Sequence, residues 1–271
     1  DILTNLYRPV LNQGFPAPAF LPRPEKLSAV PVVTCDLASA ELIKYAANAF
    51  LAVKISFVNE MSRLTARVGA DILQVTRGIG LDSRIGSRFL EAGIGWGGSC
   101  FGKDTAALIA TSREYGLSLP IVQAARQVNY EQRTWVVDTL LHELKILKGK
   151  TITLLGFAFK ENTDDLRDAP SLDIARQLIR QGARVNATDP VALENASRLY
   201  PDLGVSYHKD PLAALQGADA IVLVTKWPEY SRLDWAAVRE TLNNLLILDG
   251  RNFLERHELE NLGYRYVGVG R

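Results

Sequence analysis

The residues Thr151-Ile-Thr-Leu-Leu-Gly-Phe-Ala-Phe-Lys160 indicate the fold class: a short β-rich run, residues 151–155, is followed by a glycine and a turn. More runs of this kind follow it, and helical patterns separate them. Alternating strands and helices indicate a parallel sheet with right-handed crossovers, so residues 148–271 are predicted to form a Rossmann-like α/β domain. The expected strands are residues 151–155, 184–188, 220–224, 245–248 and 264–267, and the expected helices are residues 171–181, 191–199, 235–242 and 255–262.

The segment before this domain has a helical hydrophobic period. A long helix is expected to begin at Asp36 or Ser39, either of which can cap it. It continues to about Val68, and Gly69 ends it. Because the helix is apolar on most sides, it is predicted to be buried over most of its circumference in an all-α domain, residues 36–147, that forms a homodimer. Further helices are expected at residues 71–76, 104–115 and 120–147.

The first 35 residues are expected to be a connector, because they hold six of the 12 prolines. Such a density rules out one continuous helix or a central strand. Cys35, at the end of this segment, is expected to be a small buried residue, the usual role of a lone cysteine. The six prolines are Pro9, Pro16, Pro18, Pro22, Pro24 and Pro31.

Composition is that of an ordinary globular protein. A length of 271 residues predicts two domains, and 47% hydrophobic residues are enough to build their cores. A net charge of +1 gives no reason to expect nucleic acid or a membrane surface as a partner, and no apolar run is long enough to span a bilayer. The two cysteines lie far apart without a zinc motif, so no metal site or disulfide framework is expected, and the expected compartment is the cytoplasm.

The residues Gly95-Trp-Gly-Gly-Ser-Cys-Phe-Gly-Lys-Asp104 place a cysteine after a glycine-rich loop, where a helical pattern begins. A thiol at a helix N-terminus lies near unpaired N–H groups and the positive end of the macrodipole, and both favour the nucleophilic thiolate. The glycines are expected to let a bulky polar substrate approach the backbone. Cys100 is therefore predicted to be a covalent catalytic residue, with a buried structural cysteine as the alternative.

Gly93-Ile-Gly-Trp-Gly-Gly98 formally matches G-x-G-x-x-G, the glycine pattern of dinucleotide-binding folds. That pattern functions between a strand and its crossover helix, whereas residues 87–92 are expected to be helix or loop. A dinucleotide is therefore not expected at this loop.

The first true βα turn is residues 156–160, at the sheet edge where open α/β folds bind ligands. Lys160 and Arg167 follow the first strand, and Arg251 follows a later strand at the same edge. The three cations are expected to converge on a nucleotide diphosphate. A solvated surface position is the alternative for each of them taken alone.

Lys44 and Asn48 lie four residues apart in the long helix and therefore share one face. A cation and an amide there can stabilise negative charge that develops on a substrate oxygen, although a lysine that snorkels to the surface is the alternative. Asp104 lies four residues after Cys100 and is expected to face the same pocket. A neighbouring cation such as Lys44 would offset the effect of its charge on the thiol.

Taken together, these segments resemble the nucleotide-sugar dehydrogenases. The resemblance runs from about Asp36 to the C-terminus in the family's order, and the block around Cys100 is its most specific part. Gly102 stands where the family often has proline, which removes no functional group. The family's NAD-binding domain is missing from this sequence, and the proline-rich segment resembles its tail, so the chain alone is expected to be inactive. The resemblance rests on residues 40–50, 78–86, 97–104, 156–160 and 248–251.

The resemblance implies oxidation of a sugar CH₂OH to a carboxylate with NAD, and UDP-glucose as the best-fitting substrate. Cys100 would capture the aldehyde as a thiohemiacetal, which becomes a thioester that water hydrolyses. Lys44 and Asn48 would stabilise the oxyanion, and Asp104 would assist proton transfer or position water. GDP-mannose and UDP-N-acetyl-hexosamines are alternative substrates. A noncatalytic nucleotide-binding and dimerisation module is an alternative function, and a cysteine hydrolase is a more distant one because no histidine is tied to Cys100 by its sequence context.

The resemblance also implies binding roles. Arg84 is expected to reach across the dimer to the substrate of the partner subunit. The residues expected at NAD are Cys100, Lys103 and Arg167. The residues expected to contact the UDP-sugar are Lys44, Asn48, Arg84, Phe89, Leu90, Gly93, Gly95, Gly97, Phe159, Lys160 and Arg251.

Overall fold

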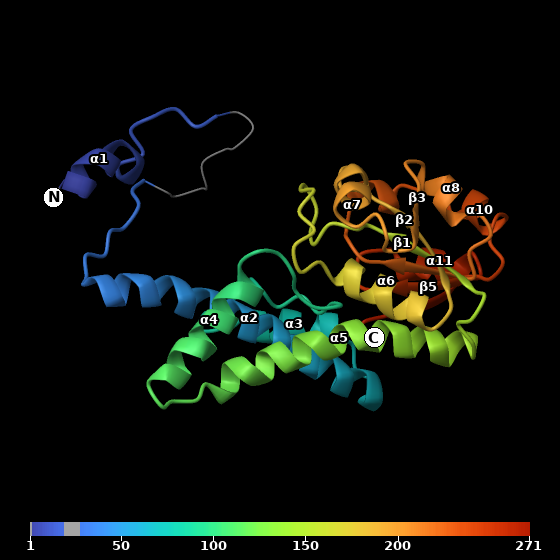
Figure 1. Ribbon diagram of the computed structural model, residues 1–271, viewed down its shortest axis with the longest axis horizontal. Coiled ribbons are helices and arrows are strands. Elements are labelled where there is room, and N and C mark those ends of the chain that lie inside the picture. The colour runs from blue at the N-terminus through green and yellow to red at the C-terminus, as the bar shows by residue number, and fades with distance from the viewer. Residues whose placement is uncertain (1, 19–27) are drawn as a thin grey trace. The chain divides into compact units, whose positions relative to one another are not determined.

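The computed structural model describes residues 2–18 and 28–271 (Figure 1). The chain divides into two compact units, Asp1–Lys44 and Tyr45–Arg271. Pro22 and Pro24 of the expected connector lie outside the described residues.

The first unit contains the helix α1 (Ile2–Leu11), which the proline count did not predict. Residues 2–8 hold no proline, so their N–H groups remain available, and Pro9 removes only one N–H near the end of the helix. None of its residues is buried. Cys35 is also exposed, and its expected burial is wrong because so short a stretch of chain builds no core of its own.

The long helix α2 (Leu37–Val68) begins and ends as predicted. Asp36 caps it, since its Oδ1 accepts the Ser39 backbone N–H at 2.8 Å, and Gly69 follows it with a φ of +73°. The expected burial around most of the helix is wrong for the single chain, because only one face meets the other elements and large apolar side chains remain exposed elsewhere. The buried residues are Ala49, Ala52, Ser56, Val58, Asn59, Ser62 and Thr65.

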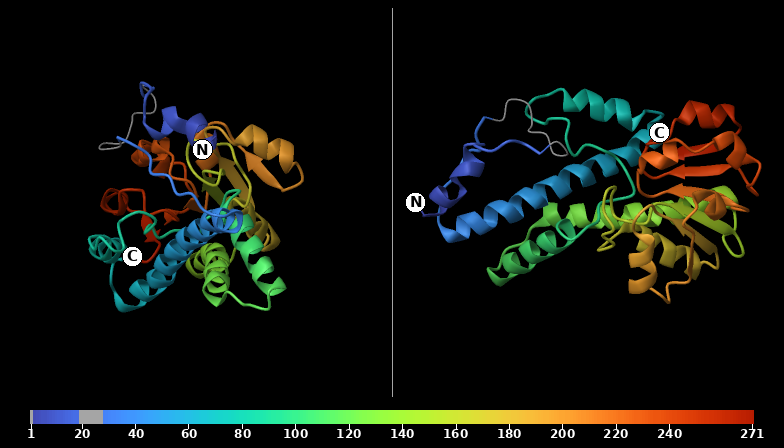
Figure 2. Two further views of the ribbon diagram at one scale, coloured as in Figure 1. Left: turned by 90° about the vertical axis from the view of Figure 1, so that its left-hand side faces the viewer. Right: turned by 90° about the horizontal axis from the view of Figure 1, so that it is seen from above.

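Three further helices follow: α3 (Ile72–Gly80), α4 (Phe101–Glu114) and α5 (Pro120–Leu144). The α4 helix begins three residues earlier than expected, directly after the cysteine. The α5 helix ends three residues earlier, because Lys145 adopts the left-handed conformation with a φ of 65°. Part of α2 lies beside α5 (Figure 2), where the Ser56 hydroxyl donates to the Ala125 carbonyl at 2.8 Å.

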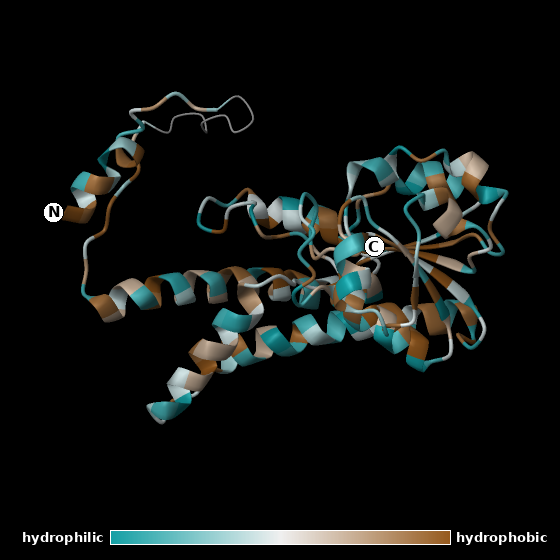
Figure 3. Cartoon of the chain, turned by 45° about the horizontal axis from the view of Figure 1, so that its top comes forward, coloured by the Kyte–Doolittle hydropathy of each residue, from teal (hydrophilic) through white to brown (hydrophobic). Residues whose placement is uncertain are grey.

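The remaining chain forms the predicted sheet, with six parallel strands in the order β3-β2-β1-β4-β5-β6. Its central strands are brown in Figure 3 because apolar residues face both layers of helices. The expected strands are confirmed to within one residue, and the third strand was missed because three residues show no period. The strands are β1 (Thr151–Leu155), β2 (Arg184–Thr188), β3 (Val205–Tyr207), β4 (Ala220–Leu223), β5 (Leu246–Asp249) and β6 (Arg265–Gly268).

One hydrophobic core joins the helical region to the sheet, since Val58 of α2 and Leu140 of α5 belong to the same cluster as Leu154 of β1. A second cluster covers the other face of the sheet. No helix in residues 2–18 or 28–271 is long and apolar enough to cross a membrane. The helices of the sheet domain are α6 (Pro170–Arg180), α7 (Leu193–Leu199), α8 (Pro211–Leu215), α9 (Pro228–Ser231), α10 (Trp235–Arg239) and α11 (Arg256–Asn261).

Candidate active site

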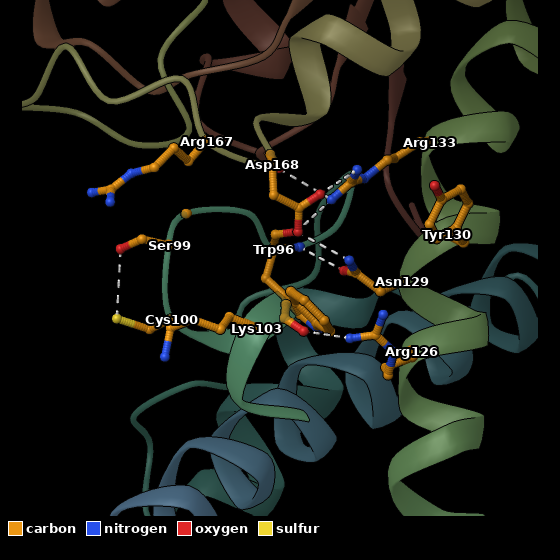
Figure 4. Close-up of a pocket in the computed structure, with 12 residues that line it drawn as sticks. Trp96, Ser99, Cys100, Lys103, Arg126, Asn129, Tyr130, Arg133, Arg167 and Asp168 are labelled. Atoms are coloured by element: carbon orange, nitrogen blue, oxygen red, sulfur yellow. Dashed lines mark hydrogen bonds and ion pairs between the residues drawn. The ribbon is translucent and has the colours of Figure 1, made fainter. Parts of the chain in front are cut away.

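Cys100 is exposed at the N-cap of α4, as the sequence predicted. Its Sγ lies 3.7 Å from the Ser99 hydroxyl and opens on a cavity of about 620 Å³ (Figure 4). The start of α4, the middle of α5 and the loop before α6 contribute the walls. The lining residues are Trp96, Gly98, Ser99, Cys100, Gly102, Lys103, Arg126, Asn129, Tyr130, Arg133, Arg167 and Asp168.

The lining of this cavity carries four cationic side chains and one carboxylate. All three residues expected at NAD, namely Cys100, Lys103 and Arg167, lie on its wall. Lys103 forms an ion pair with Asp104 that raises the lysine pKa, and Arg167 forms one with Asp165 at 2.7 Å. Both cations remain largely exposed. Such a lining favours an anionic ligand.

Buried amide side chains hold the backbone of residues 93–98, which we call the cysteine loop. Asn129 accepts the Trp96 N–H at 2.7 Å and donates to the Trp96 carbonyl at 3.0 Å. Gln132 donates to the Gly93 carbonyl, and Asn59 of α2 accepts the Gly93 N–H, both at 2.8 Å. The sequence patterns did not predict a role for these residues. The feature that could have indicated those on α5 is a row of polar residues, three or four positions apart, along a helix that faces the core.

Arg133 extends the same row of polar residues on α5 and was also missed. It is 1% exposed and donates to two carboxylates, Asp168 at 2.9 Å and Asp173. It also donates to the Trp96 carbonyl at 2.9 Å and to the Asp168 carbonyl at 3.2 Å. Burial acts to lower the pKa of Arg133, but the bonds to both carboxylates outweigh burial and raise it.

The glycines of the cysteine loop let the protein's own chain approach the loop closely. A Cβ at Gly97 would lie 2.3 Å from the Asp168 carbonyl oxygen. A Cβ at Gly95 would lie 2.7 Å from Asn129 Oδ1, and one at Gly98 would lie 2.7 Å from the Phe159 ring. As expected, no strand precedes this loop in residues 87–92, so the glycine pattern is not a dinucleotide fingerprint.

Asn48 and Asp104 are brought together by the fold. The Asn48 amide donates to Asp104 Oδ2 at 2.6 Å, and Asp104 is fully buried. Among the residues described, the cavity wall includes Cys100 and Lys103 but neither Asn48 nor Asp104. Lys44 is exposed on α2.

The amides of the first βα turn are already occupied by a carboxylate. Asp189, which follows β2, accepts the N–H groups of Phe157 and Ala158 at 2.7 and 3.0 Å, and the Trp227 indole N–H at 3.1 Å. An anion in that position would meet the Asp189 charge. The turn therefore does not offer the phosphate cradle of a dinucleotide-binding Rossmann fold.

Lys160, Arg167 and Arg251 do not converge on one cavity. Within the described part of the chain, only Arg167 of the three lines the cavity beside Cys100. Lys160 lies 5.4 Å from the centre of the Phe159 ring. Arg251 donates to the carbonyls of Val224 at 2.7 Å and Gly95 at 3.1 Å, and burial lowers its pKa to about 10. Arg251 therefore links the end of β5 to the cysteine loop.

The remaining expected substrate residues lie in the segment before the cysteine loop. The Arg84 side chain is 86% exposed and pairs with Asp82 at 2.6 Å. Phe89 has a positive φ of 62°, and its ring lies 6.4 Å from that of Phe101. Leu90 is buried.

The structure consists of a helical region with an exposed cysteine at a helix start, followed by a parallel α/β domain, as the resemblance to the nucleotide-sugar dehydrogenases implied. The model for the central domain of the UDP-glucose/GDP-mannose dehydrogenase family matches residues 38–131, and the model for its UDP binding domain matches residues 153–256. The chain belongs to this family of oxidoreductases, which confirms the resemblance seen in the sequence.

Individual relatives of the chain belong to the same family. The chain is 46% identical over 241 residues to UDP-glucose 6-dehydrogenase TuaD of Bacillus subtilis (strain 168), a match that covers 89% of this chain and 52% of that protein. A UDP-glucose dehydrogenase structure from Pyrobaculum islandicum has a TM-score of 0.84 at 36% identity, covering 99% of this chain and 55% of that one. A UDP-D-ManNAc dehydrogenase structure from Pyrococcus horikoshii has a TM-score of 0.72 at 26% identity, covering 86% and 52%. The chain spans about half the length of the curated relatives it matches.

Proposed function

We propose that this chain is the cysteine-bearing, nucleotide-binding part of an NAD-dependent UDP-glucose 6-dehydrogenase. The observation that carries the proposal is the position of Cys100. Its thiol is exposed at the start of α4 and opens on a cationic cavity, in a chain that belongs to a family of oxidoreductases. A thiol nucleophile must stay reduced, so we place the reaction in the cytoplasm.

NAD fits the donor set of this cavity rather than the first βα turn. Lys103 and Arg167 would hold its negatively charged part next to Cys100, since both are exposed cations on the same wall. The βα turn does not fit, because Asp189 already occupies its amides. When bound, NAD would supply the hydride acceptor.

In the proposed chemistry, the Cys100 thiolate attacks the aldehyde carbon, a C–S bond forms, and the carbonyl electron pair moves to oxygen. Lys44 and Asn48 would stabilise that oxyanion. The oxyanion then re-forms the carbonyl as the carbon loses a hydride, for which bound NAD would be the acceptor, as it would be in the earlier oxidation of the alcohol to the aldehyde. Cys100 would now hold the same carbon as a thioester, and attack by water breaks the C–S bond and releases the carboxylate and the thiol. The buried Asp104 accepts from Asn48 and pairs with Lys103, so it would orient both side chains and take part in proton transfer.

The proposed UDP-sugar site uses the loop from residue 84 to residue 97 and the edge of the sheet. Arg251 supports this grouping, because its side chain contacts the Gly95 carbonyl. The proposed contacts are Lys44, Asn48, Arg84, Phe89, Leu90, Gly93, Gly95, Gly97, Phe159, Lys160 and Arg251.

We further propose a homodimer formed through α2. Phe50, Phe57 and Leu64 are 65, 48 and 55% exposed and recur at seven-residue spacing. A heptad stripe of large apolar side chains is suited to another copy of the same helix. The exposed Arg84 would then reach the partner's site. Sedimentation of the chain and of a Phe50→Glu/Phe57→Glu variant tests this, and a monomeric parent chain would contradict it.

Two measurements test the proposed function. Calorimetric titration should show tighter binding of UDP-glucose than of GDP-mannose or UDP-N-acetylmannosamine, and preference for either of the other two would reassign the substrate. The structural similarity to a UDP-D-ManNAc dehydrogenase makes that sugar the second candidate.

The other measurement is alkylation of Cys100 by iodoacetamide as a function of pH, with the exposed Cys35 replaced by serine. We expect Cys100 to react faster than a free thiol at neutral pH, because the N-terminus of a helix favours the thiolate. Cys100→Ser is the labelling control. Ordinary reactivity would instead favour a noncatalytic nucleotide-binding module.

A further inference from the structure

The loop before α6 lies directly across the cysteine loop. The Gly98 N–H donates to the Arg167 carbonyl at 2.8 Å, and the absent Cβ of Gly97 leaves space for the Asp168 carbonyl. Asp168 has a φ of 51°, a conformation that a residue other than glycine adopts only when its surroundings hold it. Arg167 and Asp168 therefore join the sheet domain to the segment that ends at Cys100, in addition to the contacts that Phe159 and Arg251 make with the cysteine loop.

The side chain of Arg133, on α5, contacts both the loop before α6 and the cysteine loop. One of its terminal nitrogens bonds the carboxylates of Asp168 and Asp173, and the other bonds the carbonyls of Trp96 and Asp168. One planar side chain therefore contacts α6, the loop before it and the cysteine loop. Arg133 is buried, and its Nε has no hydrogen-bond partner within the described residues. Its hydrogen bonds therefore involve only the two terminal nitrogens of the guanidinium.

We propose that Arg133 is the positioning residue through which the sheet domain sets the reactivity of Cys100. The proposal rests on the proposed function, in which that thiol is the nucleophile. Arg133 holds the Trp96 and Asp168 carbonyls together. It thereby sets the position of the cysteine loop, and with it the position of Cys100 relative to the first N–H groups of α4. When these contacts are lost, Cys100 moves away from the helix N-terminus and less thiolate forms.

Two features separate this role from that of a simple charge. Lysine would keep the charge at position 133, but its single nitrogen cannot present the flat, two-sided fork that bonds carboxylates on one side and carbonyls on the other. Arg176 is a natural control, because it also pairs with Asp173, at 3.3 Å, and has no hydrogen bond or ion pair to the cysteine loop among the contacts of the described residues.

The experiment measures the rate and pH dependence of Cys100 alkylation by iodoacetamide in the chain with Cys35 replaced by serine. Arg133→Lys and Arg133→Gln should both slow the reaction near neutral pH at least about threefold, the lower end of couplings between residues in contact. Both should move the half-maximal pH upward. Arg176→Gln should match the parent chain. Circular dichroism and urea unfolding establish that each variant is folded.

If Arg133→Lys reacts like the parent, the contribution is charge alone and the proposal fails. It also fails if Arg176→Gln slows the reaction as much as Arg133→Gln does. Asp168→Asn covers the case in which Arg133 variants do not fold, because asparagine tolerates a positive φ while its neutral amide weakens the bond to Arg133. This variant should slow alkylation, and unchanged kinetics would overturn the proposal.

Failure of this proposal can be distinguished from failure of the proposed function. Ordinary reactivity of Cys100 in the parent chain would count against catalysis. The ratio of rates between the Arg133 and Arg176 variants would still report whether the loop is positioned by Arg133.

Discussion

Two glycine-containing loops of this protein differ both in their sequence pattern and in their structural setting. The cysteine loop matches a dinucleotide fingerprint and follows no strand, whereas the turn at residues 156–160 lacks the fingerprint and follows β1. In both, side chains of the protein occupy the backbone polar groups. Neutral amides of α2 and α5 hold the cysteine loop, and the Asp189 carboxylate holds the turn.

The difference shows where an anion can bind. The Asp189 charge excludes an anion from the turn, while the neutral amides behind the cysteine loop leave the cationic cavity in front of it available. Glycine serves close packing in both loops, so a glycine pattern alone does not identify a phosphate site. The predictions below measure how firmly each loop is held.

The largest effect is expected for Gly156→Ala in the turn. Gly156 has a φ of 92°, and an added Cβ would lie 2.4 Å from Thr225 Cβ. Backbone strain and overlap together should lower the free energy of unfolding by about 3 kcal/mol or more. Gly204→Ala is the control, since its φ of 77° is similar but its nearest neighbour is 3.6 Å away. Equal losses in urea unfolding would show that overlap contributes nothing.

Asp189→Asn should rank second. The carboxylate accepts from the backbone amides of two loops and from Trp227, and an asparagine would turn its NH₂ group toward some of these donors. We expect a loss of about 2–3 kcal/mol in the free energy of unfolding. Asp210→Asn is the control, because Asp210 is an exposed N-cap and asparagine caps equally well. A tolerated Asp189→Asn would remove the claimed difference between the loops.

Asn129→Leu tests the cysteine loop in the same way. Leucine has a similar volume but leaves the buried Trp96 N–H without its acceptor, which should cost about 1–2 kcal/mol. The expected cost is smaller than for Asp189 because the Trp96 carbonyl keeps its bond from Arg133. Gln127→Leu, at an exposed position two residues away, should change stability by no more than about 0.5 kcal/mol. A larger loss for Asn129→Leu than for Asp189→Asn would reverse the ranking.

The smallest effect on stability is expected for the ion pair between Asp165 and Arg167, in the loop before α6. The Arg167 guanidinium holds the pKa of Asp165 below its usual value of 3.8. A depressed carboxyl pKa stabilises the folded state above pH 3.8, and that contribution is lost as the pH falls through the folded-state value. Asp165→Asn should therefore lower stability at pH 7 by less than about 1 kcal/mol, because Arg167 is largely exposed.

Thermal unfolding of Asp165→Asn and the parent chain from pH 7 to pH 2 tests this. The two melting temperatures should converge at the acid end. A difference that persists at pH 2 would show that the ion pair is not its source. Asp164→Asn, whose carboxylate accepts from Asn195 rather than from a cation, is the control.

Local patterns predicted most of the elements. Asp36 and Gly69 bounded α2 correctly, and the β-rich runs became neighbouring parallel strands. The short strand β3 was not predicted, because Val205–Tyr207 is too short to show the alternating hydrophobic pattern of a strand. The cysteine was correctly placed at a helix start because capping depends on residues close in sequence.

The partners of the site could not be found in this way. Asn129 and Arg133 lie more than thirty residues after the loop that they hold, and their bonds depend on which face of α5 meets it. Arg251 followed a predicted strand as expected, yet its side chain points to backbone carbonyls instead of the shared cavity.

Patterns within a few residues were sufficient to predict the order of helices and strands, the position of Cys100 at a helix start and the family to which the chain belongs. Which groups face the thiol, and which polar groups already have partners, depends instead on contacts between distant segments. Buried polar groups are destabilising unless they are hydrogen-bonded, and the partners of this site come from segments that lie far apart in the sequence.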